Sequence, residues 1–332
     1  MQKTGDGMGC EVFLPTGSSR DFCQALMTKH PKMRLPLFGQ WELTYRCNLR
    51  CIHCYTDVYN HPRYFQKELQ TWEILRILDE LRKAGCLWLC LTGGEALMRE
   101  DFFEIYRTAK EKGFLLILHT NGTLITEKAA DFLKDYPPLL VEITLHATKA
   151  ELFEKITQRK GSFGKVLQGI ESLLQRNISL VLKVVGLTLN RDEILKVRTF
   201  VKQLGGVQFK FGEGLRDRLD GREDVYTYQL SEEELKVIEE EDPEMLQERE
   251  LRLRDAEPPV CEAGIFTFHI DAFGQLQLCS RVRTKSYDLR KGSFDEGFYR
   301  YLHAFPCPFP RKMAAFEKEG MVSAEAAVAA SP

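Results

Sequence analysis

One stretch decides the fold: TWEILRILDELRKAGCLWLCLTGGE, residues 71–95. Its first part, Thr71 to Lys83, carries apolar side chains at helical spacing with charged residues between them. The next apolar run, Leu87 to Leu91, is short and lies between glycines, as in a strand buried on both faces. A helix followed by such a strand is the repeating unit of a parallel sheet, so this stretch predicts an α/β protein.

The same alternation continues on both sides of residues 71–95. Six strands are expected, at Gly39–Thr44, Leu87–Leu91, Leu115–His119, Val141–Leu145, Leu180–Leu187 and Val207–Phe211. The helices between them are expected at Thr71–Lys83, Asp101–Lys112, Glu127–Tyr136, Ser162–Gln175 and Asp192–Leu204. Six units in about 180 residues fit a partial (β/α)6 TIM-like barrel, because a closed eightfold barrel typically needs about 250. Its functional site is expected at the carboxyl ends of the strands.

Composition excludes several classes of protein. The 332 residues are 44% apolar and 28% charged, and 46 basic against 48 acidic residues leave a net charge of −2. No overall basic field is available to hold a nucleic acid or an anionic membrane. The chain has no run of about 18 apolar residues and no secretory signal pattern, so we expect a cytoplasmic protein. In reducing cytosol its ten cysteines are not expected to form a disulfide framework, and clustered ones are better explained as metal ligands or catalytic groups.

Three cysteines lie within eight residues directly after the first expected strand, in Cys47-Asn48-Leu49-Arg50-Cys51-Ile52-His53-Cys54. A loop this short can turn three sulfurs toward one point. Three thiolates suit a four-iron cluster with one iron left open, since closed electron-transfer clusters use four cysteines. Zinc held by three cysteines and a histidine is the competing interpretation, although His53 is adjacent to Cys54, and plain loop thiols are a third.

A second motif, Gly93-Gly94-Glu95, ends the second expected strand. Two glycines allow a ligand to approach the backbone closely, and a carboxylate can accept hydrogen bonds from an ammonium group. By itself this motif is weak and is more typical of a strand-to-helix turn with an acidic residue at the helix start.

Together, the cysteine loop and the Gly-Gly-Glu segment about 40 residues later resemble the radical S-adenosylmethionine (SAM) superfamily, over roughly Leu37 to Arg216. The resemblance implies a [4Fe-4S] cluster on Cys47, Cys51 and Cys54 whose open iron binds SAM. It implies that Gly93, Gly94 and Glu95 hold the methionine amino group. Proline usually follows in the family where this chain has Ala96, a change that loosens a turn and removes no ligand.

Weaker correspondences follow the later strands. Asn121, in Thr120-Asn121-Gly122, ends the third strand in a form that the family often shows. The resemblance places Thr144 where a hydroxyl contacts ribose or methionine, and Lys165 where a basic residue faces the methionine carboxylate. An ordinary strand-end hydroxyl and a solvated helix lysine remain equally open alternatives. Cys86 and Cys90 are expected to be buried core thiols.

A third motif lies in the C-terminal part, where Cys261-x2-Gly precedes an expected hairpin that ends in Gly-x4-Cys279. The hairpin strands are expected at Phe266–Ile270 and Gln275–Cys279, with Asp271 capping the turn through its side chain. The arrangement resembles the opening of the SPASM or twitch extension of radical SAM maturases, which carries auxiliary clusters. A full extension supplies seven cysteines, whereas only Cys307 follows here, so either one second [4Fe-4S] cluster or a hairpin with spare thiols is expected. Ser280 replaces the aspartate that serves as a base in some sulfatase-maturing relatives, which leaves that chemistry in doubt.

These patterns divide the chain into five parts. We expect an N-terminal extension at 1–36, with a short helix near Asp21 to His30, and a radical SAM core at 37–230. A helical linker is expected at 231–257, for which a surface helix of the barrel is an equal alternative. The SPASM/twitch-like β-hairpin extension is expected at 258–312 and a tail at 313–332.

The function expected is that of a radical SAM oxidoreductase or maturase that abstracts hydrogen from a peptide or protein side chain. The alternative within the same class is a dehydrogenase or maturase acting on a small molecule. From a different class, a non-catalytic iron–sulfur or zinc module would need no ammonium acceptor at Glu95. The expected partners are the substrate and an external electron donor such as flavodoxin or ferredoxin, and neither nucleic acid nor membrane.

Overall fold

The computed structural model describes residues 33–212, 214–247 and 261–304, together with residues 25 and 29 and two short N-terminal strands. These strands, β1 (Phe13–Leu14) and β2 (Gly17–Ser18), pair with each other in antiparallel fashion. The expected helix near Asp21 to His30 falls mostly outside the described residues. Cys10, Cys23, Cys307 and the tail at 313–332 also lie outside them.

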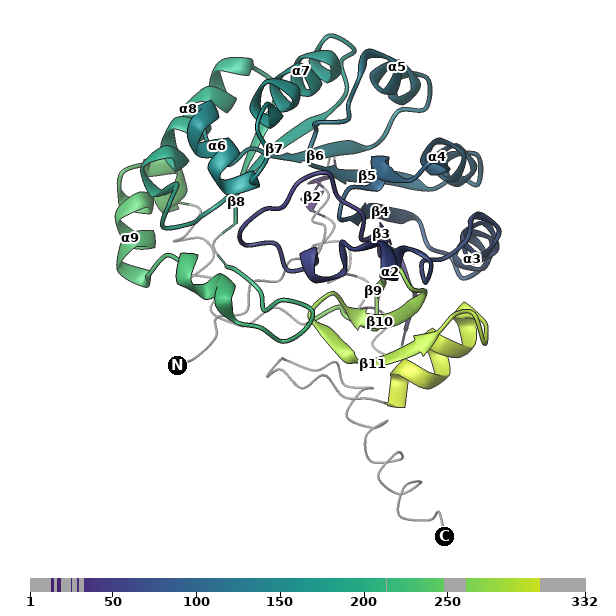
Figure 1. Cartoon of the computed structure of the whole chain (residues 1–332). Coiled ribbons are helices and arrows are strands. Elements are labelled where there is room, and N and C mark those ends of the chain that lie inside the picture. Colours follow the sequence, from purple (N-terminus) through teal and green to yellow (C-terminus); the bar gives the residue numbers. More distant parts are fainter. Residues whose placement is uncertain are drawn as a thin grey trace.

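Six parallel strands form the centre of the molecule, in chain order across the sheet. They are β3 (Phe38–Thr44), β4 (Trp88–Gly93), β5 (Leu115–Thr120), β6 (Leu140–Thr144), β7 (Leu180–Val185) and β8 (Gln208–Gly212). Each expected strand is present, with ends shifted by one or two residues. The sheet curves into an open barrel (Figure 1), so the expected α/β partial barrel is confirmed.

The helices lie on the outer, convex side of this sheet (Figure 1). They are α3 (Thr71–Lys83), α4 (Phe102–Glu111), α5 (Glu127–Asp135), α6 (Ala150–Thr157), α7 (Ser162–Leu174) and α8 (Ile194–Leu204). Short turns are η1 (Asp57–Tyr59), α2 (Pro62–Phe65), η2 (Ala96–Met98), η3 (Arg191–Glu193) and η4 (Asp224–Tyr228). Helix α6 was not expected from the sequence, since its eight residues are too few to show a clear period.

Alternation along the strands decides which side chains face the helices. Trp41 and Leu43 of β3 pack with Ile74 and Ile77 of α3 in the main apolar core. The strand residues between them face the other way, into the barrel. A smaller cluster of Phe38, Trp88, Cys90 and Ile117 with Phe266 fills the amino-terminal end of the interior, with Phe38 and Trp88 stacked at 4.4 Å. The interior therefore has an apolar base at the amino-terminal ends of the strands.

The C-terminal hairpin is part of the main sheet. Strand β9 (Thr267–Ile270) runs parallel to β3, with Phe38 opposite Thr267 and Trp41 opposite Ile270. Strands β10 (Gln275–Cys279) and β11 (Val282–Asp288) follow in antiparallel fashion, giving the order β11-β10-β9-β3-β4-β5-β6-β7-β8. The expectation of a separate two-stranded extension was therefore incomplete. It missed β11, the π-helical segment η5 (Glu296–Tyr301) and η6 (Leu302–Ala304).

Two smaller expectations about side chains are confirmed. Asp271 caps the β9–β10 turn, where its Oδ1 accepts hydrogen bonds from the backbone N–H groups of Phe273 and Gln275, each at 2.9 Å. Cys86 and Cys90 are buried, with 7% and 1% of their surfaces exposed.

Residues 231–247 pack against the barrel and do not form a solvent-exposed connection. Helix α9 (Glu232–Glu240) begins with a capping box between Ser231 and Glu234. Ile238 and Met245 are buried in the same core as the barrel helices, and Asp242 pairs with Arg198 of α8 at 2.8 Å. The surface-helix alternative thus describes this segment better than a linker. Across the described part of the chain, no helix has both the length and the apolar character needed to cross a bilayer.

Candidate functional site

The cysteine loop begins three residues after the carboxyl end of β3 and lies on the concave side of the sheet (Figure 1). Its backbone is fastened to the end of α6, where Arg50 N–H donates to the Thr157 carbonyl and Ile52 N–H to the Ile156 carbonyl, each at 3.0 Å. Asn60 holds the loop's start, because its side chain accepts from Cys47 N–H at 3.2 Å and donates to the Cys47 carbonyl at 3.0 Å. The loop is therefore a fixed structure that presents its side chains to the barrel mouth.

The three thiols of this loop share one environment. Burial raises the pKa of Cys47 to about 12, and Glu95 and Cys54 add to that shift. Burial likewise raises the pKa of Cys51 well above its usual range, with further contributions from Cys54 and Cys47. The pKa of Cys54 is raised for the same first reason. The pKa of each thiol is thus raised further by the charge of a neighbouring group. Thiolates at these positions require a cation that balances their charge.

Among the residues that the structure describes, no three Cys, His, Asp or Glu side chains stand at the spacing of ligands to a single metal ion. The three thiols lie on one loop, and soft thiolate ligands suit both an iron–sulfur cluster and zinc.

The two glycines after β4 bring two backbone segments together. Gly93 has φ +134°, and a Cβ there would lie 2.2 Å from the Thr44 carbonyl oxygen. A Cβ on Gly94 would lie 2.5 Å from the Arg46 carbonyl oxygen. This contact is closed by hydrogen bonds from Gly94 N–H to Thr44 at 2.8 Å and from Glu95 N–H to Arg46 at 2.7 Å. Both glycines are thus required by the approach of β4 to the chain that leads into Cys47.

Glu95 is fully buried, and its carboxylate joins the ends of β4 and β5. It accepts hydrogen bonds from Asn121 N–H at 2.7 Å, from the Thr120 hydroxyl at 2.9 Å and from Leu97 N–H at 3.2 Å. Burial raises the pKa of Glu95, although these donors act in the opposite direction. The structure therefore places this carboxylate at the edge of the site with three protein donors already in contact.

Asn121 connects Glu95 to the cysteine loop. Its side-chain amide donates to Asn48 Oδ1 at 2.9 Å and lies 3.8 Å from Cys47 Sγ, while its own N–H binds Glu95. Asn48 in turn donates to the Thr123 hydroxyl at 2.8 Å. Residues that the sequence placed after three successive strands thus meet at one point.

The remaining candidate residues lie apart from this contact. Thr144 is half-buried at the end of β6, opposite Lys183 of β7. Lys165 is exposed in the first turn of α7, next to Val166, which packs on Gly122. Cys261 and Cys279 are free and half-buried against the main core.

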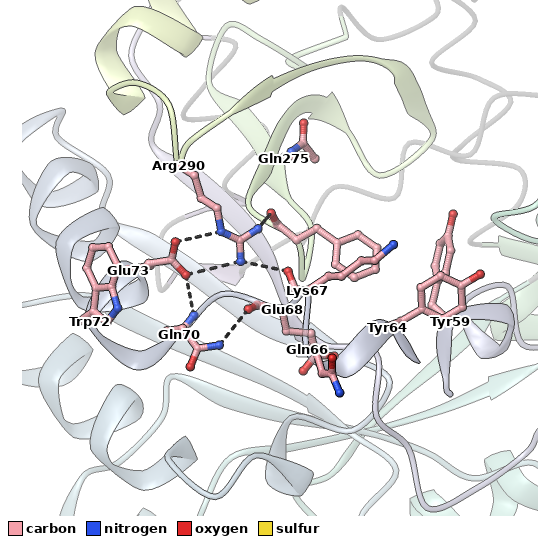
Figure 2. A pocket seen from close by; sticks show the side chains of 11 residues that line it. Tyr59, Tyr64, Gln66, Lys67, Glu68, Gln70, Trp72, Glu73, Gln275 and Arg290 are labelled. Atoms are coloured by element: carbon pink, nitrogen blue, oxygen red, sulfur yellow. Dashed lines mark hydrogen bonds and ion pairs between the residues drawn. The ribbon is translucent and has the colours of Figure 1, made fainter. Parts of the chain in front are cut away.

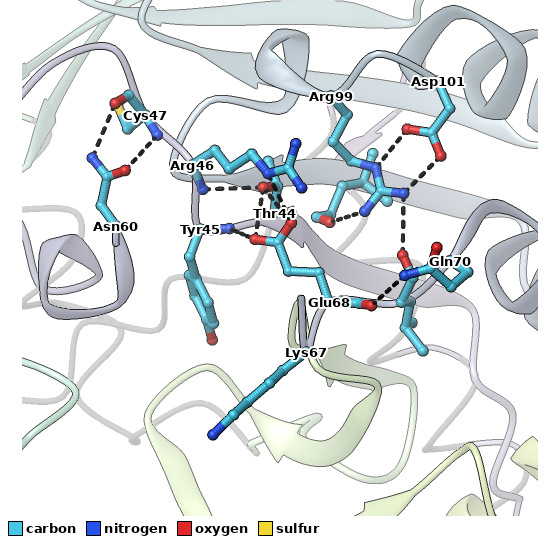
Figure 3. A network of polar contacts seen from close by, with 12 residues as sticks. Thr44, Tyr45, Arg46, Cys47, Asn60, Lys67, Glu68, Gln70, Arg99 and Asp101 are labelled. Atoms are coloured by element: carbon cyan, nitrogen blue, oxygen red, sulfur yellow. Dashed lines mark hydrogen bonds and ion pairs between the residues drawn. The ribbon is translucent and has the colours of Figure 1, made fainter. Parts of the chain in front are cut away.

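A polar network at the carboxyl end of β3, drawn in Figure 3, was not anticipated from the sequence. The buried Glu68 carboxylate accepts from the Thr44 hydroxyl and from Tyr45 N–H, each at 2.8 Å. Arg99 donates to the Leu43 carbonyl at 3.0 Å and pairs with Asp101. This network fixes the chain just before Cys47. These partners are distant in sequence and follow no period, so no sequence signal could have indicated them.

A buried ionic cluster fills the interior next to the C-terminal hairpin. Glu42 of β3 has no exposed surface and binds the Arg283 guanidinium through both oxygens at 2.8 and 2.9 Å. It also accepts from the hydroxyls of Tyr45 and Tyr55, and His269 lies 3.4 Å away. Burial alone would raise the pKa of Glu42, but Arg283 and His269 hold it well below its usual range.

A second ionic group lines the opposite wall. Glu142 of β6 pairs with Lys210 at 2.8 Å, His119 at 3.8 Å and Lys183 at 3.9 Å. Burial alone would raise the pKa of Glu142, but these three neighbours hold that pKa at about 2. A charged residue inside an otherwise apolar strand, as in Leu140–Thr144, is the sequence signal that could have indicated this interior.

A surface pocket of about 750 Å³ lies between residues 59–73 and the C-terminal segment 273–290 (Figure 2). Tyr59, Tyr64 and Phe273 form its aromatic wall, and Trp72 and Arg290 lie toward the other end. None of the candidate ligand or cofactor residues lines it. The pocket is therefore separate from the cysteine site.

The structure thus combines a parallel open barrel with a three-thiol loop at the carboxyl ends of its strands, where the functional sites of parallel barrels lie. Residues 41–201 match the model of the Radical SAM superfamily. This part of the chain is therefore a radical SAM domain. The superfamily implies a [4Fe-4S] cluster and SAM as cofactors.

Individual relatives fall into more than one functional group. The "AdoMet-dependent heme synthase" of Methanosarcina barkeri (strain Fusaro / DSM 804) is 33% identical over 52% of this chain and 49% of its own length. The "Antilisterial bacteriocin subtilosin biosynthesis protein AlbA" of Bacillus subtilis (strain 168) is 28% identical over 74% of this chain and 55% of its own. The present chain thus spans about half the length of these two curated relatives.

A solved structure shares the fold. The crystal structure of Streptococcus suis SuiB bound to precursor peptide SuiA superposes with a TM-score of 0.66 at 14% identity, covering 84% of this chain and 68% of that one. The superposition therefore covers more of the chain than residues 41–201.

Proposed function

We propose that this chain is a radical SAM enzyme in which Cys47, Cys51 and Cys54 hold the [4Fe-4S] cluster. The observation that carries the proposal is the position of Asn121, whose side-chain amide lies 3.8 Å from Cys47 Sγ and whose backbone N–H donates to the Glu95 carboxylate. Because of this contact, the cysteine loop and the Gly-Gly-Glu segment belong to one site. Gly93, Gly94, Glu95, Asn121 and Thr144 are the residues that would surround SAM, with Lys165 as a more distant candidate.

With one electron from a donor such as flavodoxin or ferredoxin, the bound cofactors supply methionine and a 5′-deoxyadenosyl radical that abstracts hydrogen. The protein's own residues would bind these cofactors, orient the cysteine ligands and shield the site. Asn60 and Asn121 orient the half-buried Cys47. The ionic groups around Glu42 and Glu142 give the substrate space polar walls.

A peptide or protein side chain is the substrate class that we propose. SuiB, which was solved with a precursor peptide, shares the fold over most of this chain, and AlbA is named for bacteriocin biosynthesis. A polar, charged interior suits a peptide, whose backbone amides and side chains need hydrogen-bonding partners.

A small-molecule substrate is the second candidate. It is favoured by the heme synthase relative, whose identity of 33% exceeds that of AlbA over a shorter region. The auxiliary cluster separates the two candidates. We propose that Cys261, Cys279 and Cys307 hold a second cluster in a peptide maturase, with the fourth iron bound by water, substrate or a non-thiolate residue.

Two measurements test these proposals. The first is formation of 5′-deoxyadenosine from SAM under reducing, oxygen-free conditions, comparing the intact chain with Cys51→Ala and with Cys86→Ala as a buried-thiol control. Activity should vanish only in Cys51→Ala. Activity retained in that variant contradicts the cluster assignment, and no product from the intact chain favours a non-catalytic metal module.

The second measurement is iron and acid-labile sulfide per chain after anaerobic reconstitution. A triple alanine variant at Cys261, Cys279 and Cys307 should hold about four iron atoms where the intact chain holds about eight. If both proteins hold about four iron atoms per chain, the auxiliary-cluster proposal fails and the small-molecule candidate is favoured.

A further inference from the structure

The segment after β8 folds back onto the cysteine loop. Arg218 donates through Nη1 to the carbonyl of Cys54 at 2.8 Å and through Nη2 to the carbonyl of Ile52 at 2.9 Å. One residue later, Leu219 N–H donates to the Tyr55 carbonyl at 2.9 Å. Three successive contacts thus attach this segment to the part of the loop that carries the third thiol.

The Arg218 guanidinium is itself held in place. Its Nε donates to Asp224 Oδ1 at 2.7 Å, and its backbone N–H donates to the Arg222 carbonyl at 2.9 Å, closing a tight turn through Gly221. Only 11% of the Arg218 side chain is exposed. A planar guanidinium bound on both edges has little freedom, so its two donors remain directed at the loop carbonyls.

The charge of Arg218 also reaches Cys54, since the two groups interact electrostatically. Two carboxylates lie nearby. Asp224 is 51% exposed, so water screens its charge more than that of the shielded arginine, and Asp57 is paired with Arg50 at 2.9 Å. Arg218 therefore contributes a fixed positive charge beside the third cysteine, and Asp57 acts there in the opposite direction.

We propose that Arg218 is a positioning residue that clamps the cysteine loop and raises the reduction potential of the cluster bound there. The proposal rests on the cluster assignment above. Adding an electron makes the cluster more negative, so a fixed positive charge nearby favours the reduced form. In this proposal Arg218 acts through the cysteine loop, without contact to substrate or SAM.

The test compares Arg218→Gln, Arg218→Lys and Arg222→Gln after anaerobic reconstitution. Arg222 is the matched control, because it is an arginine of the same segment whose side chain is 60% exposed and pairs only locally with Asp220. Iron content is measured first, and the midpoint potential is then measured by a redox titration followed by electron paramagnetic resonance. We expect a more negative potential for Arg218→Gln at unchanged iron content, a smaller shift for Arg218→Lys, and none for Arg222→Gln.

Equal potentials in the intact chain and Arg218→Gln overturn the proposal, as does an equal shift in Arg222→Gln. If Arg218→Gln loses iron, hydrogen–deuterium exchange of the iron-free chains decides. Faster exchange at residues 50–56 in Arg218→Gln than in Arg222→Gln supports the clamp, and equal exchange overturns it. If the intact chain binds no iron, the cluster assignment fails by itself, and the same exchange comparison still judges the clamp.

Discussion

Arg216 donates a hydrogen bond from Nη1 to the Ser280 hydroxyl at 2.8 Å, and this contact joins the two ends of the sheet. Arg216 follows β8, whereas Ser280 lies in the turn between β10 and β11, and β8 and β11 are the two edge strands. Tyr55 lies between Arg216 and Arg283, with ring-to-guanidinium distances of 5.6 and 5.7 Å. The residue directly after Cys54 thus packs where the barrel's open side is bridged.

Ser280→Ala should lower the free energy of unfolding by about 1–2 kcal/mol, because it removes the acceptor of a partly buried, charge-assisted hydrogen bond. Chemical denaturation of the single variants and of the double variant with Arg216→Gln gives a double-mutant cycle. We expect Ser280→Ala to cost almost nothing in the Arg216→Gln background. An equal cost in both backgrounds shows that the serine stabilises the turn by other contacts.

Gly93→Ala should destabilise the chain by more than about 3 kcal/mol or prevent folding. The new Cβ would meet the Thr44 carbonyl oxygen at 2.2 Å, and φ +134° is itself unfavourable for alanine. Gly164→Ala is the control, since Gly164 lies in α7 and a Cβ there meets nothing within 4 Å. That variant should be neutral or more stable by up to about 1 kcal/mol. Similar thermal unfolding of both variants contradicts this account.

Glu95→Gln tests whether this carboxylate serves SAM or the fold. The change replaces one acceptor oxygen by an NH2 group in a buried site with three donors, so a loss of about 1–3 kcal/mol in stability is expected. We further expect weaker SAM binding at unchanged iron content, because an ammonium contact is altered and no iron ligand is removed. Calorimetric titration of the reconstituted variant with SAM gives the affinity. If the variant loses both its iron and its ability to bind SAM, Glu95 has a purely structural role.

Asp271→Asn should change how stability depends on pH. Burial raises the pKa of Asp271 to about 6 from an ordinary value of 3.8, so the folded chain holds this proton more tightly than the unfolded chain. Its contribution is therefore fully present below about pH 4 and is lost as the pH rises through 6. Asparagine keeps the turn-capping oxygen and does not titrate.

Relative to the intact chain, Asp271→Asn should gain about 2 kcal/mol between pH 4 and pH 7, measured by denaturant unfolding at each pH. The difference between the two proteins cancels the titration of other groups. A difference that stays constant over this range means that the Asp271 carboxyl titrates alike in the folded and unfolded chains.

The periodic elements were predictable because each strand and helix is decided by its own residues. Leu115–Thr120 is an apolar run of strand length, and Thr71–Lys83 has one apolar face, so neither needs a distant partner to be assigned. The pairing of β9 with β3 was not predictable in the same way. Phe38 and Thr267 show no local sign of each other, and only the closed geometry of the sheet brings them together.

The site was predictable to the same extent. The cysteine loop and the Gly-Gly-Glu segment are contiguous motifs, and the rule that parallel strands share a carboxyl edge placed them together. The residues that hold these motifs in place lie elsewhere in the sequence. Asn60 binds the Cys47 carbonyl, and Arg218 binds the Cys54 carbonyl. Such supports depend on loop conformations that no periodicity encodes.

The pairing of β3 with β9 has a consequence for how the chain folds during synthesis. About 230 residues separate Phe38 from Thr267, so one edge of β3 has no partner until nearly the whole chain has left the ribosome. At ~5–20 residues per second, that edge waits roughly 10–50 s. An unpaired apolar strand edge is a site for misassociation with other chains. The hairpin that closes the site is therefore also the element that ends this exposed interval, and its late arrival makes the nascent barrel a candidate substrate for chaperones.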